Sequence, residues 1–389
     1  MSRAAPPPPG ASASTALRIL VVGTHPNANQ PSMSQFATWF EQALRPLGAV
    51  RRISAPAVFK RAPGDAGAAK WLAYLDQYVV LTLWLAVIHS RHDIIVVADH
   101  SNAPAAGLVP RSKLIVMVHD TIAIRQARGE IEQAPPVGAT GRLLQRRILA
   151  GLRRAALLLL NPGPVERQLA ELGVSAPCAM VGCPVDTHRL SEPVAPDGAP
   201  TGPYVLNVGG DGWRKRKGDL LRLWAASDQA CPLPVLVLAG STSDATRIEL
   251  MRLGLQDRVR LYDDVSDGQL AWFYRHSQAL VAAGHDEGFC IPVAEACSFG
   301  KPVFAPSTAE IYPMIFGDAV TTIDMDDPRA GAVALSRHLG RAVSSSAGSG
   351  RAIAEKWSQQ AFEVRVRTAV AGMAPAGHDR RRAGKPMQA

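Results

Sequence analysis

Short apolar runs alternate with helical patterns along both halves of the chain, and this alternation constrains the fold more than any other feature. Within each run the apolar residues are consecutive rather than spaced by two, so both faces of the strand would be buried, as in a parallel sheet. The runs lie at residues 17–25, 93–101, 113–120, 155–161, 204–210, 234–240, 259–264, 279–284 and 302–307. Helical patterns such as residues 33–48 and 140–155 separate them. The sequence therefore predicts an α/β protein with two Rossmann-like, doubly wound domains.

The length and a proline-rich break indicate where the two domains meet. A chain of 389 residues is more naturally two domains than one. Residues 191–203 are rich in Pro and Gly and separate the two sets of runs, which is typical of a linker. The expected segments are a disordered leader (1–15), a first domain (16–190), the linker (191–203), a second domain (204–350), a closing helix (351–373) and a disordered basic tail (374–389).

Cysteine usage and the first residues bear on the compartment. The five cysteines are scattered and form no C-x-x-C pair, which argues for a reducing compartment and against a disulfide framework or a zinc site. The first residues lack the apolar core of a signal peptide. We therefore expect a cytoplasmic protein.

One segment, residues 71–89, has the composition of a membrane helix. Asp76 and Gln77 interrupt it and leave an apolar run at residues 78–88, which is shorter than the ~20 residues that cross a bilayer. We expect a buried or surface-lying helix here rather than a membrane span.

The positive charge is concentrated in the first half of the chain. Residues 1–195 contain 20 Lys and Arg against 12 Asp and Glu, whereas the rest contains 22 against 21. No interleaving of basic and aromatic residues and no known motif indicates nucleic acid as a partner. An anionic membrane face, a phosphorylated substrate or a plain solvated surface remain as interpretations.

The stretch "HDEGFCIPVAEACSFGKP", residues 285–302, contains the strongest candidate site. It follows a predicted strand, so Glu287 falls in a strand-to-helix loop and Glu295 in the first turn of the next helix. A helix N-terminus suits a phosphate, and Gly288 lets a ligand approach the backbone. Two carboxylates beside that point can each accept hydrogen bonds from paired hydroxyl groups. A ligand with a sugar at each end and a pyrophosphate in the middle would fit.

This stretch, with "YVLNVGGDGWRKRKGDLLRLW" and "DRVRLYDDVSDGQLAWFYRHSQALV", resembles glycosyltransferase family 4 and related retaining transferases of the GT-B fold. The resemblance is strongest at residues 204–301 and implies two domains that face a central cleft. It implies that Glu295 holds the ribose of a nucleotide-sugar donor and that Glu287 holds the donor sugar. The pyrophosphate would lie along Gly288, Phe289, Cys290 and Ile291, with Cys290 where the family usually has a second glycine.

A second candidate site is the loop "GGDGWRKRKGD", residues 209–219, which begins with Gly209. Four consecutive basic residues, from Arg214 to Lys217, follow the first strand of the second domain. Similar enzymes use an Arg and a Lys here to neutralise the leaving diphosphate, and Lys217 matches the lysine. Gly210 stands where the family has its arginine, so Arg214 or Arg216 would replace it. Fixed cations of this kind can stabilise the leaving group without a metal, and we expect neither metal nor cofactor.

Other candidates follow strands of either domain. His119 follows a strand of the first domain, and similar transferases carry a His-Asp pair here whose histidine reaches the donor sugar. Asp120 would orient this histidine or cap the following segment. The base would be recognised near Tyr262 to Val265. Candidates for the acceptor side are His25, Ser34, His100 and Asp120.

The resemblance implies a metal-independent retaining hexosyltransferase. It would move a sugar from a nucleotide-sugar to a glycan or lipid-linked acceptor, in surface polysaccharide or glycoconjugate synthesis. The basic first domain, the run at 78–88 and the arginines of residues 142–154 suggest a peripheral position on the inner face of the cytoplasmic membrane. The alternatives are a GT-B epimerase or phosphorylase, or a catalytically silent GT-B protein that acts as a binding or assembly partner.

Overall fold

The computed structural model describes residues 16–27, 31–61, 68–340 and 346–373. The chain divides into two compact units, Met1–Val116 with Glu363–Ala389 and Met117–Phe362. The leader and the tail expected at the two ends lie outside the described residues. The domain limits expected from the sequence remain a prediction.

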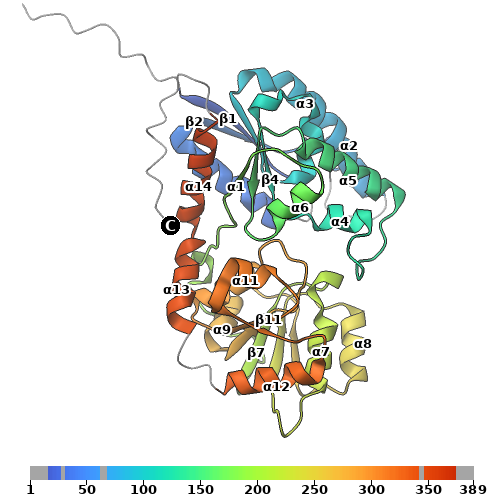
Figure 1. The fold of residues 1–389 in the computed structure, drawn as a ribbon, viewed down its shortest axis with the longest axis vertical. Coiled ribbons are helices and arrows are strands. Elements are labelled where there is room, and N and C mark those ends of the chain that lie inside the picture. The colour runs from blue at the N-terminus through green and yellow to red at the C-terminus, as the bar shows by residue number, and fades with distance from the viewer. Residues whose placement is uncertain (1–15, 28–30, 62–67, 341–345, 374–389) are drawn as a thin grey trace, which may run out of the picture. The chain divides into compact units, whose positions relative to one another are not determined.

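The first sheet has six parallel strands in the order β2-β1-β3-β4-β5-β6 (Figure 1). Its strands are β1 (Leu17–Val22), β2 (Gly48–Ile53), β3 (Ile94–Val97), β4 (Leu114–Val118), β5 (Leu157–Leu160) and β6 (Cys178–Met180). In register, Val22 lies opposite Ile53 on one side and Val97 on the other. The chain leaves β1 for β2 on one side and then places β3 on the other side. The strand order therefore reverses between β1 and β3, which defines a topological switch point.

Helices connect these strands, as the alternating pattern predicted. The helices expected at 33–48 and 140–155 are α1 and α5, shifted by a few residues at their ends. The helices are α1 (Pro31–Leu44), α2 (Ala68–Leu75), α3 (Leu81–Ile88), α4 (Ile122–Arg128), α5 (Ala139–Leu152) and α6 (Val165–Glu171). Short 3-10 helices are η1 (Arg45–Leu47), η3 (His89–Arg91), η4 (His100–Leu108), η5 (Arg111–Lys113) and η6 (His188–Leu190).

The helical segment around Asp76 is longer than the sequence predicted. A π-helical turn, η2 (Asp76–Val80), joins α2 to α3, so one helical segment runs from Ala69 to Arg91. Asp76, which interrupts the apolar run in the sequence, does not interrupt the helical segment, because its carboxylate is buried and its hydrogen bonds are satisfied. It accepts hydrogen bonds from the backbone N–H groups of Phe59 and Lys60 at 3.0 and 2.9 Å. By length and composition alone the segment could cross a membrane.

The second sheet repeats the plan with six parallel strands in the order β12-β11-β10-β7-β8-β9. The strands are β7 (Tyr204–Val208), β8 (Val235–Ala239), β9 (Val259–Tyr262), β10 (Ala279–Val281), β11 (Val303–Pro306) and β12 (Val320–Ile323). After β9 the chain crosses back and places β10 on the free side of β7, where Ala279 lies opposite Val205. The switch point of this sheet is therefore between β7 and β10.

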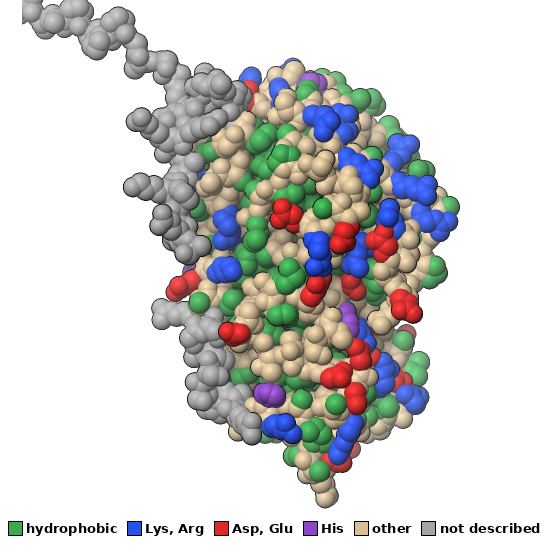
Figure 2. Space-filling model, in the orientation of Figure 1, with side chains coloured by type: hydrophobic (Ala, Val, Ile, Leu, Met, Phe, Trp, Pro, Cys, Tyr) green, Lys and Arg blue, Asp and Glu red, His purple; other side chains and the backbone are tan. Residues whose placement is uncertain are grey.

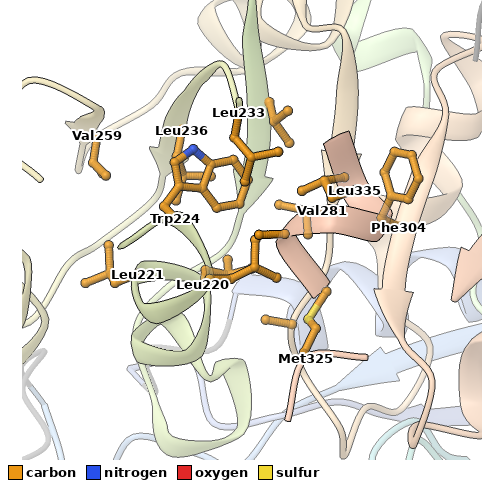
Figure 3. Packing of buried hydrophobic residues seen from close by; sticks show 14 of the residues in the cluster. Leu220, Leu221, Trp224, Leu233, Leu236, Val259, Val281, Phe304, Met325 and Leu335 are labelled. Atoms are coloured by element: carbon orange, nitrogen blue, oxygen red, sulfur yellow. The ribbon is translucent and has the colours of Figure 1, made fainter. Parts of the chain in front are cut away.

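One face of the second sheet carries a hydrophobic core. Figure 3 shows Trp224 among leucines of the neighbouring elements, with Phe304 and Met325 in the same cluster. The Trp224 indole N–H donates to the carbonyl of Pro234 at 2.8 Å, so its one polar atom is satisfied. The helices of this part are α7 (Lys217–Ala225), α8 (Asp244–Arg252), α9 (Asp267–His276), α10 (Ile291–Ser298), α11 (Ile311–Phe316) and α12 (Pro328–Leu339), with η7 (Trp213–Lys215) and η8 (Gly317–Ala319).

Two helices replace the single closing helix expected at 351–373. They are α13 (Ser346–Lys356) and α14 (Gln359–Ala371), separated by Trp357 and Ser358. The break occurs because the Trp357 carbonyl accepts a hydrogen bond from the Val185 N–H at 2.8 Å, outside any helix. Ser358 then caps the next helix, since its hydroxyl accepts from the Ala361 N–H at 3.2 Å.

Basic side chains are concentrated on α5. This helix contains no Asp or Glu, and Arg142, Arg146 and Arg147 are exposed on it. Figure 2 shows Lys and Arg side chains gathered in the region of this helix, with acidic side chains lying mostly elsewhere.

Candidate functional site

Two loops leave the carboxyl edge of the second sheet at its switch point. One follows β7 and contains the four consecutive basic residues, and the other follows β10 and contains Glu287. The Lys215 Nζ atom lies 2.7 Å from Glu287 Oε1, so an ion pair joins the loops. Burial alone would lower the pKa of Lys215, but the charge of Glu287 raises it above its usual value. Crevices at switch points are where open α/β sheets bind ligands.

Close packing fixes the position of the Glu287 carboxylate. Its side chain is only 8% exposed. A Cβ atom at Gly284 would lie 2.5 Å from Glu287 Oε1 and 3.1 Å from the Arg214 carbonyl, so a larger residue would displace the carboxylate and shift the β7 loop. Gly284 therefore lets the two loops approach each other at this point.

The four basic residues of the β7 loop have different environments. Lys217 is the first residue of α7 and is buried, and its Nζ donates to the carbonyl of Ser241 at 2.8 Å. Burial lowers the pKa of Lys217. Arg216 pairs with Asp219 and with Asp326, whereas Arg214 is half-buried. Thus Lys215, which the sequence did not single out, contacts a candidate carboxylate.

Gly209 begins this loop with a backbone that favours glycine. Its φ of +139° lies in the region that side-chain-bearing residues rarely adopt. The side chain of Lys215 passes over it, because a Cβ at Gly209 would lie 3.7 Å from Lys215 Cε. The glycine thus lets the chain turn directly after β7 beneath the cation.

Glu295 has other partners than the Lys215–Glu287 ion pair. Since α10 begins at Ile291, Glu295 is in the second turn, and the prediction of a first-turn position was wrong by one turn. The residue is 1% exposed. Its carboxylate forms an ion pair with Arg189 and accepts a hydrogen bond from the Tyr274 hydroxyl at 2.8 Å. Arg189 also pairs with Asp267, at the start of α9.

The loop that leads into α10 is strained at one residue. Cys290 has a φ of +63°, a left-handed conformation that usually requires glycine. Burial raises the pKa of its thiol to about 12, so the thiol is un-ionised at neutral pH. Phe289 is buried and packs edge-on against Trp357, with ring centroids 5.3 Å apart. Ile291 is the first residue of the helix.

Gly288 brings this loop against the His119–Asp120 pair. A Cβ atom at Gly288 would lie 2.9 Å from the His119 carbonyl oxygen and 3.3 Å from Asp120 Oδ2. The imidazole of His119 is buried, and its carbonyl accepts from Asn161 Nδ2 at 3.0 Å. Asp120 Oδ1 accepts from the Ile122 N–H at 2.9 Å, so Asp120 caps α4, one of its two predicted roles.

A polar cavity of about 360 Å³ lies within the second unit. Asp120 and Glu287, two candidates from the sequence, both line it, and so does His285. Burial and the neighbouring Arg216 lower the pKa of His285, which favours the neutral imidazole. The volume is in the range of small-molecule sites.

Val265, the candidate at the base-recognition position, lies half-buried between β9 and α9. The next residue, Ser266, forms a capping box with Gln269, which fixes the start of α9. Before it, Tyr262 donates its hydroxyl hydrogen to the Gly198 carbonyl at 2.7 Å. Main-chain groups around Val265 are thus held in a defined loop.

The acceptor-side candidates of the first unit gather at the switch point of the first sheet. His25 follows β1, is buried, and places Nε2 3.2 Å from Asp76 Oδ2. The Ser34 hydroxyl lies 3.3 Å from that of Thr24, and His100 opens η4 directly after β3. Asn102 donates to the Gly23 carbonyl at 3.2 Å and so ties the β1 and β3 loops together.

Three of these site residues were not identified from the sequence. Lys215 was within reach, because it stood in the basic run, but nothing in the pattern distinguished it from its neighbours. Arg189 is 106 positions before Glu295 and has no local motif. Asp76 was read only as an interruption of an apolar segment. Among the residues that the structure describes, no group of three or more His, Cys, Asp or Glu could hold a metal ion.

Residues 195–361 match the family model described as Glycosyl transferases group 1. The matched segment contains the ion pair between Lys215 and Glu287 as well as Glu295. No curated protein matches the chain.

Solved structures with the same fold cover nearly the whole chain. A sucrose-phosphate synthase from Thermosynechococcus elongatus is 18% identical, with a TM-score of 0.62 over 91% of this chain and 94% of that one. The lipopolysaccharide outer core galactosyltransferase WaaB is 14% identical, with a TM-score of 0.63 over 92% and 99%. HepE from Anabaena, in complex with UDP and glucose, is 13% identical, with a TM-score of 0.66 over 92% and 100%. The two parallel sheets therefore form a GT-B fold.

Proposed function

We propose that this protein is a group 1 glycosyltransferase that transfers a sugar from a nucleotide-sugar to an acceptor hydroxyl, with retention and without a metal. The observation that carries the proposal is the ion pair between Lys215 and Glu287 at the switch point of the second sheet. It lies inside the segment that matches the family model. A cation for a leaving diphosphate and an acceptor for sugar hydroxyls thus stand next to each other.

The chemistry requires stabilisation of the charge that builds on the leaving diphosphate. In the proposed complex, Lys215 and the arginines beside it face this charge, together with the positive end of the α10 dipole. Glu287 accepts hydrogen bonds from hydroxyls of the donor sugar. Lys217 remains a candidate for the diphosphate, and in this structure its amino group donates to the main-chain carbonyls of Gly240 and Ser241.

Glu295 is proposed to bind the ribose hydroxyls of the donor. Arg189 and Tyr274 already hold its carboxylate, so its orientation is fixed before any ligand arrives. A carboxylate has more lone pairs than these two donors use, which leaves acceptor capacity for a hydroxyl.

His119 and Asp120 are proposed to lie beside the donor sugar, because Gly288 packs directly against them. With retention, the acceptor hydroxyl attacks from the face that the diphosphate leaves, and a phosphate oxygen takes its proton. Loss of a hydroxyl proton to a neighbouring phosphate requires no further basic side chain.

The donor, the acceptor and the location complete the proposal. The HepE structure holds UDP and glucose, which makes UDP-sugars the first donors to test. The acceptor is proposed to be a glycan or a lipid-linked sugar in surface polysaccharide or glycoconjugate synthesis. The protein would then act in the cytoplasm, at the inner face of the membrane.

The test is release of nucleoside diphosphate from a panel of UDP- and GDP-sugars, with simple glycosides as acceptors and with EDTA in a parallel series. Acceptor-dependent release that EDTA leaves unchanged supports the proposal, and NMR of the product anomer decides retention. Release that needs free phosphate would indicate a phosphorylase. Conversion of the donor without an acceptor would indicate an epimerase.

A protein that only binds is the second candidate, because both carboxylates already have cationic partners in this structure. Tight binding of a nucleotide-sugar without turnover, for every acceptor tested, would favour it over the transferase.

A further inference from the structure

The helical segment from Ala69 to Arg91, which runs along α2 and α3 (labelled in Figure 1), has exposed apolar side chains along one side. From Trp71 to Val87, every residue that is exposed is apolar. These residues, called the apolar face below, are between 36% and 69% exposed and are Trp71, Leu72, Leu75, Val79, Leu83 and Val87. An ordinary surface helix carries polar side chains at such positions. Removing this apolar face from water, into an apolar environment outside the protein, would therefore be favourable.

The opposite side of the same segment is fixed to its own unit. Leu81, Leu85 and Ile88 are buried. The buried Asp76 carboxylate binds the backbone at Phe59 and Lys60, which holds the middle of the segment down. A segment held along its length cannot leave the unit to cross a bilayer without exposing these groups. The exposed apolar face therefore points away from the unit along the length of the helix. This is the arrangement of a helix that lies in the plane of a membrane interface.

Charge around the apolar face fits an anionic surface. Asp76 is the only acidic residue from Ala69 to Arg91, and it is buried. Lys70 and Arg91 are exposed at the two ends of the segment. Basic residues that flank an apolar stripe, with Trp71 beside one of them, are the pattern found at the headgroup level of membranes.

We propose that the apolar face lies in the headgroup and upper acyl region of an anionic lipid membrane. A protein partner or a second copy would be expected to meet polar groups among the apolar ones, as in most interfaces. No exposed polar side chain interrupts this face between Trp71 and Val87. The inference deepens the membrane location given with the proposed function, and it uses no residue of the proposed catalytic site.

The experiment is flotation of the full chain with vesicles of phosphatidylcholine, with and without phosphatidylglycerol, at low and high salt. The test variant is Leu83→Glu with Val87→Glu. The control is Ile248→Glu with Met251→Glu on α8, since these residues are also more than half exposed. We expect the chain and the control to float with the anionic vesicles at low salt. The test variant should bind at least about tenfold more weakly, because it places charge in the apolar face.

A second readout is made on the wild type and does not use the glutamate variant; its control is the conservative change Trp71→Phe. Lipids with brominated acyl chains should quench part of the tryptophan fluorescence of the wild type, and Trp71→Phe should lose that part. Failure of the wild type to bind anionic vesicles, or equal binding by the test and control variants, overturns the proposal. So does a dimer in sedimentation velocity that Leu83→Glu with Val87→Glu dissociates, because the apolar face would then be a self-interface.

Discussion

The two switch points of this chain share a topology and differ in chemistry. At the second sheet, Lys215 and Glu287 form a partly accessible ion pair between the two loops. At the first sheet, the corresponding loops meet through neutral hydrogen bonds and a buried contact between His25 and Asp76. Charge at one crevice and a satisfied polar network at the other indicate different tasks. We infer that the switch point of the second sheet takes part in the reaction. We infer that the switch point of the first sheet shapes or supports the fold.

Backbone strain follows the same division. Among the described residues, Arg216 and Cys290 are the non-glycine residues with φ in the left-handed region. Each directly precedes a helix at the second switch point, α7 and α10 respectively. Left-handed residues cost of order 1–3 kcal/mol and persist where the surroundings fix them, often at functional sites. The β7 and β10 loops are therefore held in one conformation by their neighbours.

The largest expected effect comes from Glu287→Gln at the second switch point. Turnover should fall about 100-fold or more, because the group that orients the donor sugar loses its charge while Lys215 keeps a hydrogen-bond acceptor. Glu249→Gln on α8 is the matched control, since Glu249 also pairs with a basic residue. Steady-state kinetics on both variants is the measurement, and equal activity of the two would remove Glu287 from the site.

Gly288→Ala tests the approach of the β10 loop to His119. A Cβ atom there would lie 2.9 Å from the His119 carbonyl, so the loop must shift. A misplacement of about 1 Å in a catalytic site can cost up to about 100-fold in rate. Gly212→Ala in the β7 loop is the control, since a Cβ at Gly212 meets nothing within 4 Å. If both variants keep full activity and melt alike, the packing of Gly288 has no bearing on catalysis.

Asp76→Asn tests whether the first switch point has a supporting role. Burial alone would raise the pKa of Asp76, but the Lys60 and Phe59 N–H groups and His25 lower it below 3.8. A carboxyl with a depressed pKa stabilises the fold above its unfolded pKa, and that stability is lost as the pH falls through the folded pKa. The free energy of unfolding should therefore drop by about 1–3 kcal/mol at pH 7, and the difference should shrink below pH ~4.

Urea unfolding at both pH values measures this effect, with the exposed Asp318→Asn as control. Donor binding should be unchanged in Asp76→Asn. A variant that keeps its stability but loses donor affinity would reverse the roles assigned to the two switch points.

The smallest expected effect is that of Cys290→Gly. Glycine relieves the left-handed strain but removes a buried side chain, so the unfolding free energy should change by less than about 1 kcal/mol. Turnover should be retained, and the wild-type thiol should react slowly with iodoacetamide at pH 8, because burial raises its pKa. Inactivation by Cys290→Gly would instead show that the thiol takes part in the reaction.

The sequence predicted the strands best where burial left no choice of side chain. Runs such as Leu157–Leu160 are apolar throughout, because both faces of the strand are covered. Strand β2 (Gly48–Ile53) was missed, because it is an edge strand with alternating exposure and two arginines. Strand β6 has three residues, too few for a pattern.

The candidate site was predictable in its loops but not in its pairings. Position after a strand sufficed to select Glu287 and the basic run. The partner of each carboxylate depends on strand order and on side-chain packing, which no local pattern encodes. The contact from Arg189 to Glu295 spans 106 positions, and the choice of Lys215 over Lys217 depends on which side of the loop each faces.

The proposal that Lys215 binds the diphosphate is tested most directly by calorimetry. The measurement is the binding of UDP, GDP and ADP to the wild type, to Lys215→Ala and to Arg252→Ala. Arg252 is the control, since it pairs with Glu249 on α8 far along the chain from both loops. We expect one diphosphate to bind the wild type and Arg252→Ala equally, and to bind Lys215→Ala at least about tenfold more weakly. Equal binding to Lys215→Ala, or no binding of any diphosphate to the folded wild type, would contradict the proposal.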